Sequence, residues 1–135
     1  MTSIDLELRD EQAARLDRFA SSVRKSRGEA SAQLIEEALR HEEFPAVEFR
    51  DSTRERQAYV VGSTLAVWEV LMVAQTYALD AARTAAHLGW PRQRAEGVLA
   101  YIRAYSPEVT AAVAENDAVS EEELRRRLPN AHWAD

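Results

Sequence analysis

The stretch DAARTAAHLGWPRQRAEGVLAYIRAY, residues 80–105, decides how this sequence is expected to fold. It divides into two helical segments at Gly89 and Pro91, the residue types preferred just after one helix and at the start of the next. Ala85 is small enough for two helices to cross closely. The space between the helices can be filled by four apolar side chains: Leu88, Trp90, Ala95 and Val98. The stretch therefore predicts a helix-turn-helix.

The second helix of this pair begins with Arg92, Gln93 and Arg94, which are expected to face solvent. In helix-turn-helix proteins this is the position from which side chains reach base edges in the major groove. We therefore predict that these three residues contact bases and that Arg83 or Arg103 contacts phosphate. An ordinary helical hairpin with a solvated basic turn would use the same residues, so that alternative stays open.

A chain of 135 residues without cysteine indicates one domain of ordinary size, or two very small ones that share a core. Four glycines, four prolines and many alanines favour a mainly helical protein. The lack of cysteine excludes a disulfide framework, a thiolate nucleophile and a zinc–thiolate site. No apolar run approaches the ~20 residues of a membrane-spanning helix, and the N-terminus lacks the apolar segment of a signal peptide. We therefore expect a cytoplasmic protein without a membrane partner.

Charge is distributed unevenly along the chain. Residues 1–43 carry seven basic and ten acidic side chains, residues 44–110 carry seven of each, and residues 111–135 carry three and six. The net charge of −6 argues against a wholly electrostatic DNA binder, because phosphate contacts supply most non-specific affinity. The neutral middle of the chain, where arginines are grouped, still allows a local basic face.

The N-terminal third predicts a strand followed by two helices. In SIDLELR, residues 3–9, apolar and charged side chains alternate, which is the period of a half-buried strand. A lone strand is not stable, so this segment must pair with another strand. Asp10 is expected to cap a first helix over residues 11–23, and a second helix is expected over residues 29–43.

This order of elements, with the run LIEEALR at residues 34–40, resembles the ribbon-helix-helix family. The resemblance implies that two chains pair their first strands and interlock their helices, because so short a segment cannot bury a core alone. The implied dimerisation residues are apolar: Ile4, Leu6, Leu8, Leu34, Ile35 and Leu39. The outward side chains are Asp5, Glu7 and Arg9, and the two carboxylates among them repel phosphate. We therefore interpret residues 1–43 as a dimerisation unit first; the alternative is a strand packed on its own helical pair.

Residues 46–50 and 56–62 predict a β-hairpin. Each segment alternates apolar with polar residues, and a polar loop separates them. Val47 and Phe49 are expected on one apolar face together with one of two pairs of residues. These alternative pairs are Ala58 with Val60, and Tyr59 with Val61.

The hairpin leads into a strongly apolar helix, expected over residues 65–79 with Thr64 as its cap. Five of its side chains are expected near the centre of the fold: Val67, Trp68, Leu71, Met72 and Tyr77. A stripe at helical spacing is typical of a core rather than of a ligand pocket. Beyond the helix-turn-helix, a further short helix is expected over residues 107–116.

The C-terminal segment, residues 113–135, predicts a separate short helix that Ser120 and Glu123 open as a capping box. A helix this short is marginal alone, so it needs a docking surface. Its apolar anchors would be Leu124, Leu128 and Trp133, because such side chains fill interface pockets. The run Arg125, Arg126 and Arg127 ends the helix. That run is either a binding element or a solvated helix end.

Residues 46–112 resemble a small antitoxin-like domain, domain-of-unknown-function family 433. The matching features are YVVG at 59–62, VWEV at 67–70, the helix-turn-helix, Ala100–Tyr101 and YSPEV at 105–109. That domain is similar to the VapB-like antitoxins of type II toxin–antitoxin systems, whose partners are PIN-like ribonucleases. The resemblance implies that the C-terminal tail binds the toxin. One arginine of the tail would enter the carboxylate-lined metal site of the toxin, since a guanidinium matches carboxylate geometry.

These patterns together predict a mainly α protein with small β elements. Residues 1–43 would dimerise, residues 44–112 would form the hairpin and helix-turn-helix, and residues 113–135 would bind the toxin. The sequence lacks a phosphate-binding loop, a nucleophile–base pair and metal-ligand spacing, so we expect no cofactor, no metal and no enzymatic activity.

The predicted function is that of an antitoxin, which neutralises a PIN-like ribonuclease toxin and represses its own operon. The chain would act as a homodimer, or as a larger hetero-oligomer with the toxin, on operator DNA. Two alternatives remain open. One is a free-standing dimeric helix-turn-helix regulator without a toxin partner, and the other is an interaction adaptor without affinity for DNA.

Overall fold

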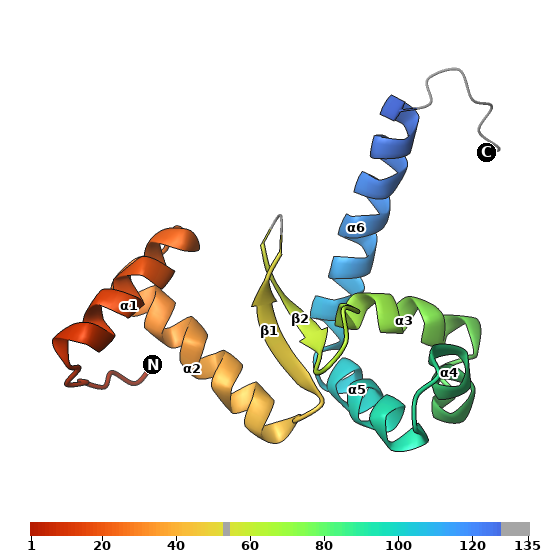
Figure 1. Ribbon diagram of the computed structural model, residues 1–135, viewed down its shortest axis with the longest axis horizontal. Helices are drawn as coiled ribbons and strands as arrows, with labels where there is room; N and C mark the ends of the chain where they lie inside the picture. The colour runs from red at the N-terminus through yellow and green to blue at the C-terminus, as the bar shows by residue number, and fades with distance from the viewer. Residues whose placement is uncertain (53–54, 128–135) are drawn as a thin grey trace.

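The computed structural model describes residues 1–52 and 55–127 of the chain, with side chains through residue 116. This part is mainly helical, as the composition predicts, and contains one two-stranded antiparallel sheet. Figure 1 shows an N-terminal helical arm, a hairpin in the middle, and a group of helices from which the last helix projects. Within the described residues, none of the helices combines the length and the apolar character needed to cross a bilayer.

The N-terminal arm consists of α1 (Asp10–Ser22) and α2 (Arg27–Glu43). The segment before it, residues 1–9, forms no strand, so the predicted strand over residues 3–9 is wrong for the single chain. The physical reason is that a strand needs a neighbour with which to exchange backbone hydrogen bonds. The predicted strand-helix-helix unit is therefore present only as its two helices.

The starts of both arm helices differ from the prediction. Asp10 lies in the first turn of α1, where its carboxylate suits the helix dipole, and Arg9 occupies the cap position. The second helix begins at Arg27 rather than at residue 29 because Ser26 and Glu29 form a capping box. The Glu29 N–H donates to Ser26 Oγ at 3.1 Å, and the Ser26 N–H donates to the Glu29 carboxylate at 3.2 Å.

The predicted hairpin is confirmed by β1 (Val47–Asp51) and β2 (Arg56–Val60). Its register places Val47 opposite Val60 and Phe49 opposite Ala58. The apolar face is thus completed by Ala58 and Val60, the first of the two alternative pairs. Val47 and Val60 are fully buried in the common core.

Four helices follow the hairpin in the described residues: α3 (Val67–Thr76), α4 (Ala81–Leu88), α5 (Arg92–Ala104) and α6 (Ser106–Arg127). Ala66, not Thr64, precedes α3, and the Ala66 N–H donates to the Glu69 carboxylate at 3.1 Å. The predicted cap at Thr64 is therefore wrong. The helix begins after Ala66 because the Glu69 carboxylate accepts from the free N–H at that position. Met72 also differs from the prediction because its side chain faces solvent.

The predicted pair of helices joined at Gly89 is confirmed by α4 and α5, an arrangement that a helix-turn-helix and an ordinary helical hairpin share. Asp80 caps α4 by accepting from the Arg83 N–H at 2.8 Å, and Gly89 ends the helix in the left-handed conformation, with φ of +69°. Ala85 is buried where the two helices cross. The predicted filling side chains are buried, Ala95 and Val98, or packed at the margin of the core, Leu88 and Trp90.

The last helix, α6, is one continuous element of 22 residues. The predicted end at residue 116 and the separate helix opened by Ser120 are therefore wrong. No glycine or proline occurs between residues 108 and 127, so nothing in the sequence stops the helix there. Val109 anchors its first turns in the core, and Figure 1 shows the rest of α6 running away from the other helices.

Arg40 joins the N-terminal arm to the helical group. Its guanidinium donates to the Tyr101 hydroxyl at 3.0 Å and to the Glu108 carboxylate at 2.6 Å. It also lies over the Tyr105 ring, 3.8 Å from the centroid, while Glu36 accepts from its Nε at 3.0 Å. Burial alone lowers the pKa of Arg40, but these hydrogen bonds, the one to Glu108 foremost, outweigh burial and raise it. The charged side chain thereby links α2 with α5 and α6.

A second ion pair fixes the arm on the hairpin. Arg56 of β2 donates to the Glu37 carboxylate of α2 at 2.8 Å, and both side chains are largely buried. The Arg56 guanidinium also lies 5.0 Å from the centre of the Phe19 ring of α1. Together with Arg40, this pair sets the angle of the arm.

The left-handed turn at Gly89 predicts that replacing this glycine by alanine destabilises the protein, whereas the same change at Gly28 does not. Gly89→Ala should lower the free energy of unfolding by about 1 kcal/mol, because a residue with a Cβ is strained at positive φ although open space surrounds it. Gly28→Ala is the matched control. It also meets open space but lies in α2, so stability should be unchanged or rise by up to about 1 kcal/mol. Urea unfolding measures both, and equal changes would contradict the left-handed turn.

The Arg40 contacts predict a loss of stability that an exposed arginine does not share. Arg40→Met should lower the free energy of unfolding by about 1–3 kcal/mol, because the buried Tyr101 hydroxyl loses its donor. Arg92→Met is the matched control: Arg92 also pairs with a glutamate one turn away, Glu96, but at an exposed site, so its loss should be below about 0.5 kcal/mol. Losses of the same size in urea unfolding would show that Arg40 acts only as a surface ion pair.

Candidate nucleic-acid interface

The start of α5 presents polar side chains to solvent. The chain enters this helix through Pro91, whose backbone is extended, with φ of −59° and ψ of 144°. Arg92, Gln93 and Glu96 are exposed, and Arg92 Nε donates to Glu96 at 2.7 Å along the helix. Arg92 and Gln93 thus occupy the first turn of the second helix, from which such proteins reach into the major groove.

Arg94 lies differently from its two neighbours. Its side chain is half-buried, and its guanidinium sits 4.6 Å from the centre of the Trp90 ring. Its Nη2 donates to the Val61 carbonyl at 2.5 Å. Gly62 is next, with φ of +73°, and a Cβ there would lie 3.5 Å from the Arg94 guanidinium. The predicted base contact of Arg94 therefore competes with a contact inside the chain.

The two predicted phosphate contacts, Arg83 and Arg103, are exposed. Arg83 lies in the first turn of α4, and its guanidinium is 5.7 Å from the centre of the Tyr77 ring. Arg103 lies in the last turn of α5. These positions leave both guanidinium groups at the surface of the helix-turn-helix, at opposite ends of the helix pair in sequence. Their contact with phosphate remains a prediction.

The loop of residues 60–65, which begins at the last residue of β2 and leads toward α3, is held by arginines from two other elements. Arg50 of β1 donates to the Ser63 carbonyl at 2.7 Å and to the Val60 carbonyl at 3.3 Å, and Arg94 of α5 binds Val61. Sequence reasoning gave Arg50 no role and assigned Arg94 to a base, so it missed the loop contacts of both residues. The Arg94 contact spans 33 positions, and no local pattern signals a contact at that separation.

The predicted dimerisation residues lie mostly at the surface of the arm. Exposed fractions are 67% for Ile4, 60% for Leu6, 41% for Leu8, 42% for Ile35 and 53% for Leu39, and Leu34 is half-buried. The structure brings Ile4, Leu6, Leu8 and Ile35 together around one shallow hollow beside α1 and α2. Large apolar side chains gathered at a surface are typical of an interaction site.

The predicted toxin-binding residues lie at and beyond the far end of α6. Leu124 and Arg125–Arg127 form its last turn, while Leu128 and Trp133 lie outside the described residues. The described fold therefore places the arginine run at the end of a projecting helix, away from α4 and α5 (Figure 1).

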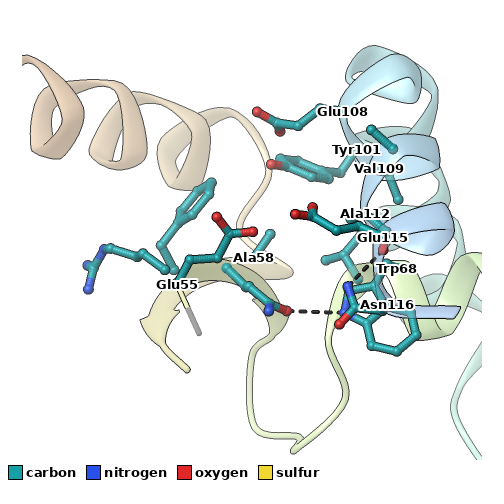
Figure 2. Close-up of a pocket in the computed structure, with 14 residues that line it drawn as sticks. Glu55, Ala58, Trp68, Tyr101, Glu108, Val109, Ala112, Glu115 and Asn116 are labelled. Atoms are coloured by element: carbon teal, nitrogen blue, oxygen red, sulfur yellow. Dashed lines mark hydrogen bonds between the residues drawn. The ribbon is translucent and has the colours of Figure 1, made fainter. Parts of the chain in front are cut away.

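A groove of about 360 Å³ lies between the hairpin and α6 (Figure 2). Phe49, Trp68 and Val109 contribute to its apolar lining, and Glu55 and Glu115 add carboxylates from its two sides. The polar N–H groups that line it are engaged within the chain: Trp68 Nε1 donates to Gln57 at 3.1 Å, and the Asn116 amide donates to the Ala112 carbonyl at 2.7 Å. Among the side chains that the structure describes, those of residues 1–52 and 55–116, no three His, Asp or Glu gather as metal ligands would.

Comparison of the chain with protein-family models, with curated proteins and with solved structures gave no match. Function therefore has to be inferred from the residues of this chain.

Proposed function

We propose that this chain is an antitoxin that neutralises a PIN-like ribonuclease toxin and represses its own operon in the cytoplasm. The observation that carries the DNA-binding part is the helix-turn-helix of α4 and α5, with Arg92 and Gln93 exposed in the first turn of α5. Proteins with this geometry read base edges from that position. The antitoxin part draws on the resemblance of residues 46–112 to the antitoxin-like domain.

A homodimer is the assembly that the arm supports. Its exposed apolar side chains, Ile4, Leu6, Leu8 and Ile35 among them, would be covered by the same face of a second chain. The unpaired alternating segment, residues 3–9, would then gain the neighbouring strand it lacks. A two-fold pair of helix-turn-helix units would contact half-sites about 34 Å apart, one turn of the DNA helix.

The toxin would be bound by the C-terminal part of the chain. The projecting end of α6 carries Arg125–Arg127, whose guanidinium groups suit the carboxylates that hold the metal of a PIN-like ribonuclease. Leu124, Leu128 and Trp133 would supply the apolar anchors. Occupation of the carboxylate site by an arginine would stop the toxin from using its metal.

The alternative function is a free-standing dimeric helix-turn-helix regulator without a toxin partner. One observation favours it: α6 is a single helix that begins in the core, so the segment that carries the arginines continues the fold rather than starting a separate tail. Both functions share the same DNA-binding surface, and they differ in whether a second protein is recovered with the chain.

The DNA-binding surface predicts a loss of affinity when its exposed side chains are removed. The double variant Arg92→Ala/Gln93→Ala should bind the DNA upstream of its own gene about tenfold or more weakly, because each base contact contributes about 1–3 kcal/mol of discrimination. Arg18→Ala removes the same charge from the exposed face of α1 and should leave binding unchanged. Fluorescence anisotropy at fixed salt measures both, and unchanged binding by the double variant would reject this surface.

The toxin contact predicts co-purification that depends on the arginine run. When the tagged chain is expressed with the product of the neighbouring gene, a small PIN-like protein should be recovered in stoichiometric amount. Changing Arg125, Arg126 and Arg127 together to Ala should reduce that recovery at least tenfold, since charge-assisted bonds to the toxin are lost. Changing Arg15, Arg18 and Arg24 to Ala is the control, with the same change of charge on the arm.

Recovery of a lone dimer that still shifts its own upstream DNA would support the free-standing regulator instead. Equal loss of the partner in both triple variants would reject a specific role for the arginine run.

A further inference from the structure

Arg94 connects the start of α5 with the loop that leaves the hairpin. We propose that Arg94 is a positioning residue, which locks the loop of residues 60–65 onto α5 and thereby sets the orientation in which Arg92 and Gln93 meet DNA. This inference rests on the proposed DNA-binding function. Under this inference Arg94 does not contact a base. It holds α5, the helix whose first turn is proposed to contact bases.

The direction of the side chain follows from its place in the helix. Residues two positions apart point to different sides of a helix, so Arg94 cannot share the exposed face of Arg92. Arg92 turns to solvent and to Glu96, whereas Arg94 turns to the hairpin loop. At the start of α5, Arg92 is therefore available for contact with DNA, whereas Arg94 contacts another part of the same chain.

Two interactions hold the Arg94 guanidinium in one place. Its central carbon, Cζ, lies over the Trp90 ring, 4.6 Å from the centroid, and its Nη2 donates to the Val61 carbonyl at 2.5 Å. A planar guanidinium can stack and donate at the same time, whereas the ammonium group of lysine is a compact point charge that does not stack. The contact therefore depends on arginine chemistry and not on charge alone.

The loop that receives Arg94 is itself held by several hydrogen bonds. Arg50 binds the carbonyls of Val60 and Ser63 on either side of Val61, and the Val60 N–H donates to the Leu65 carbonyl at 3.0 Å. Gly62 lets the backbone pass close to Arg94, with a positive φ that other residues rarely adopt. Through Arg94, the hairpin thus supports the first turn of α5.

The experiment separates positioning from direct contact with phosphate. Full-length wild-type chain is used to select a duplex from a random-sequence DNA pool. The selected duplex and a scrambled duplex of the same composition are then titrated at several salt concentrations. The variants are Arg94→Gln and Arg94→Lys, with Arg18→Gln on the exposed face of α1 as the control for charge. Thermal unfolding and amide hydrogen exchange check that each variant is folded.

If Arg94 positions α5, both of its variants should lower the ratio of affinities, selected over scrambled, about tenfold. Their affinity for the scrambled duplex and their salt dependence should stay at the wild-type values. Amide exchange should also quicken in residues 60–65 but not in α1. A role confined to stability would lower both affinities together and leave the ratio unchanged, which would overturn the proposal.

A phosphate contact would give a different pattern. Arg94→Lys would then bind like the wild type, and Arg94→Gln would reduce the slope of log affinity against log salt by about 0.9. That outcome would overturn positioning and leave the proposed function intact. A wild-type chain that enriches no duplex would overturn the proposed DNA binding and this inference with it. Should Arg94→Gln fail to unfold cooperatively, Arg94→Lys and Trp90→Phe test the same contact more gently.

Discussion

The placement of the N-terminal arm against the helical group depends on one guanidinium that is shared among three helices. Arg40 of α2 contacts Tyr101 of α5, Glu108 of α6 and the Tyr105 ring between them, largely out of solvent. Phe44, at the end of α2, also packs against the rings of Tyr101 and Tyr105, so Arg40 adds a hydrogen-bonded, charged link to an apolar one. Because Arg40 fixes the arm, a dimer built on the arm would also fix the spacing of its two helix-turn-helix units.

Arginine side chains serve the fold of this protein as much as its surface. Arg40, Arg50, Arg56 and Arg94 bind carbonyls, carboxylates or aromatic faces of the same chain. A count of arginines therefore overstates the positive charge available to DNA. The other arginines of α4 and α5 are exposed to solvent, whereas these four are at least partly buried. A net charge of −6 is compatible with DNA binding only through such a small, local face.

The arm and α6 show how a local pattern misleads when its partner is missing or its stop signal is absent. The alternating residues 3–9 have the period of a strand, but one chain offers them no neighbour. The capping box at Ser120 and Glu123 is a valid start signal, yet helical residues already precede it, so the helix simply continues. In contrast, the unrecognised box at Ser26 and Glu29 works because the chain turns just before it.

The sequence alone determined the elements whose signals are local: the hairpin, the turn at Gly89, the small Ala85 at the helix crossing and the exposed start of α5. These follow from backbone preference and from periodicity, which act over a few residues. Only the tertiary structure decided which face of β2 is buried, that Arg40 ties the arm to the helices, and that Arg94 turns to a loop 33 positions away. Such contacts depend on which surfaces the folded elements bring together. A local sequence pattern does not show which distant residues will meet in space.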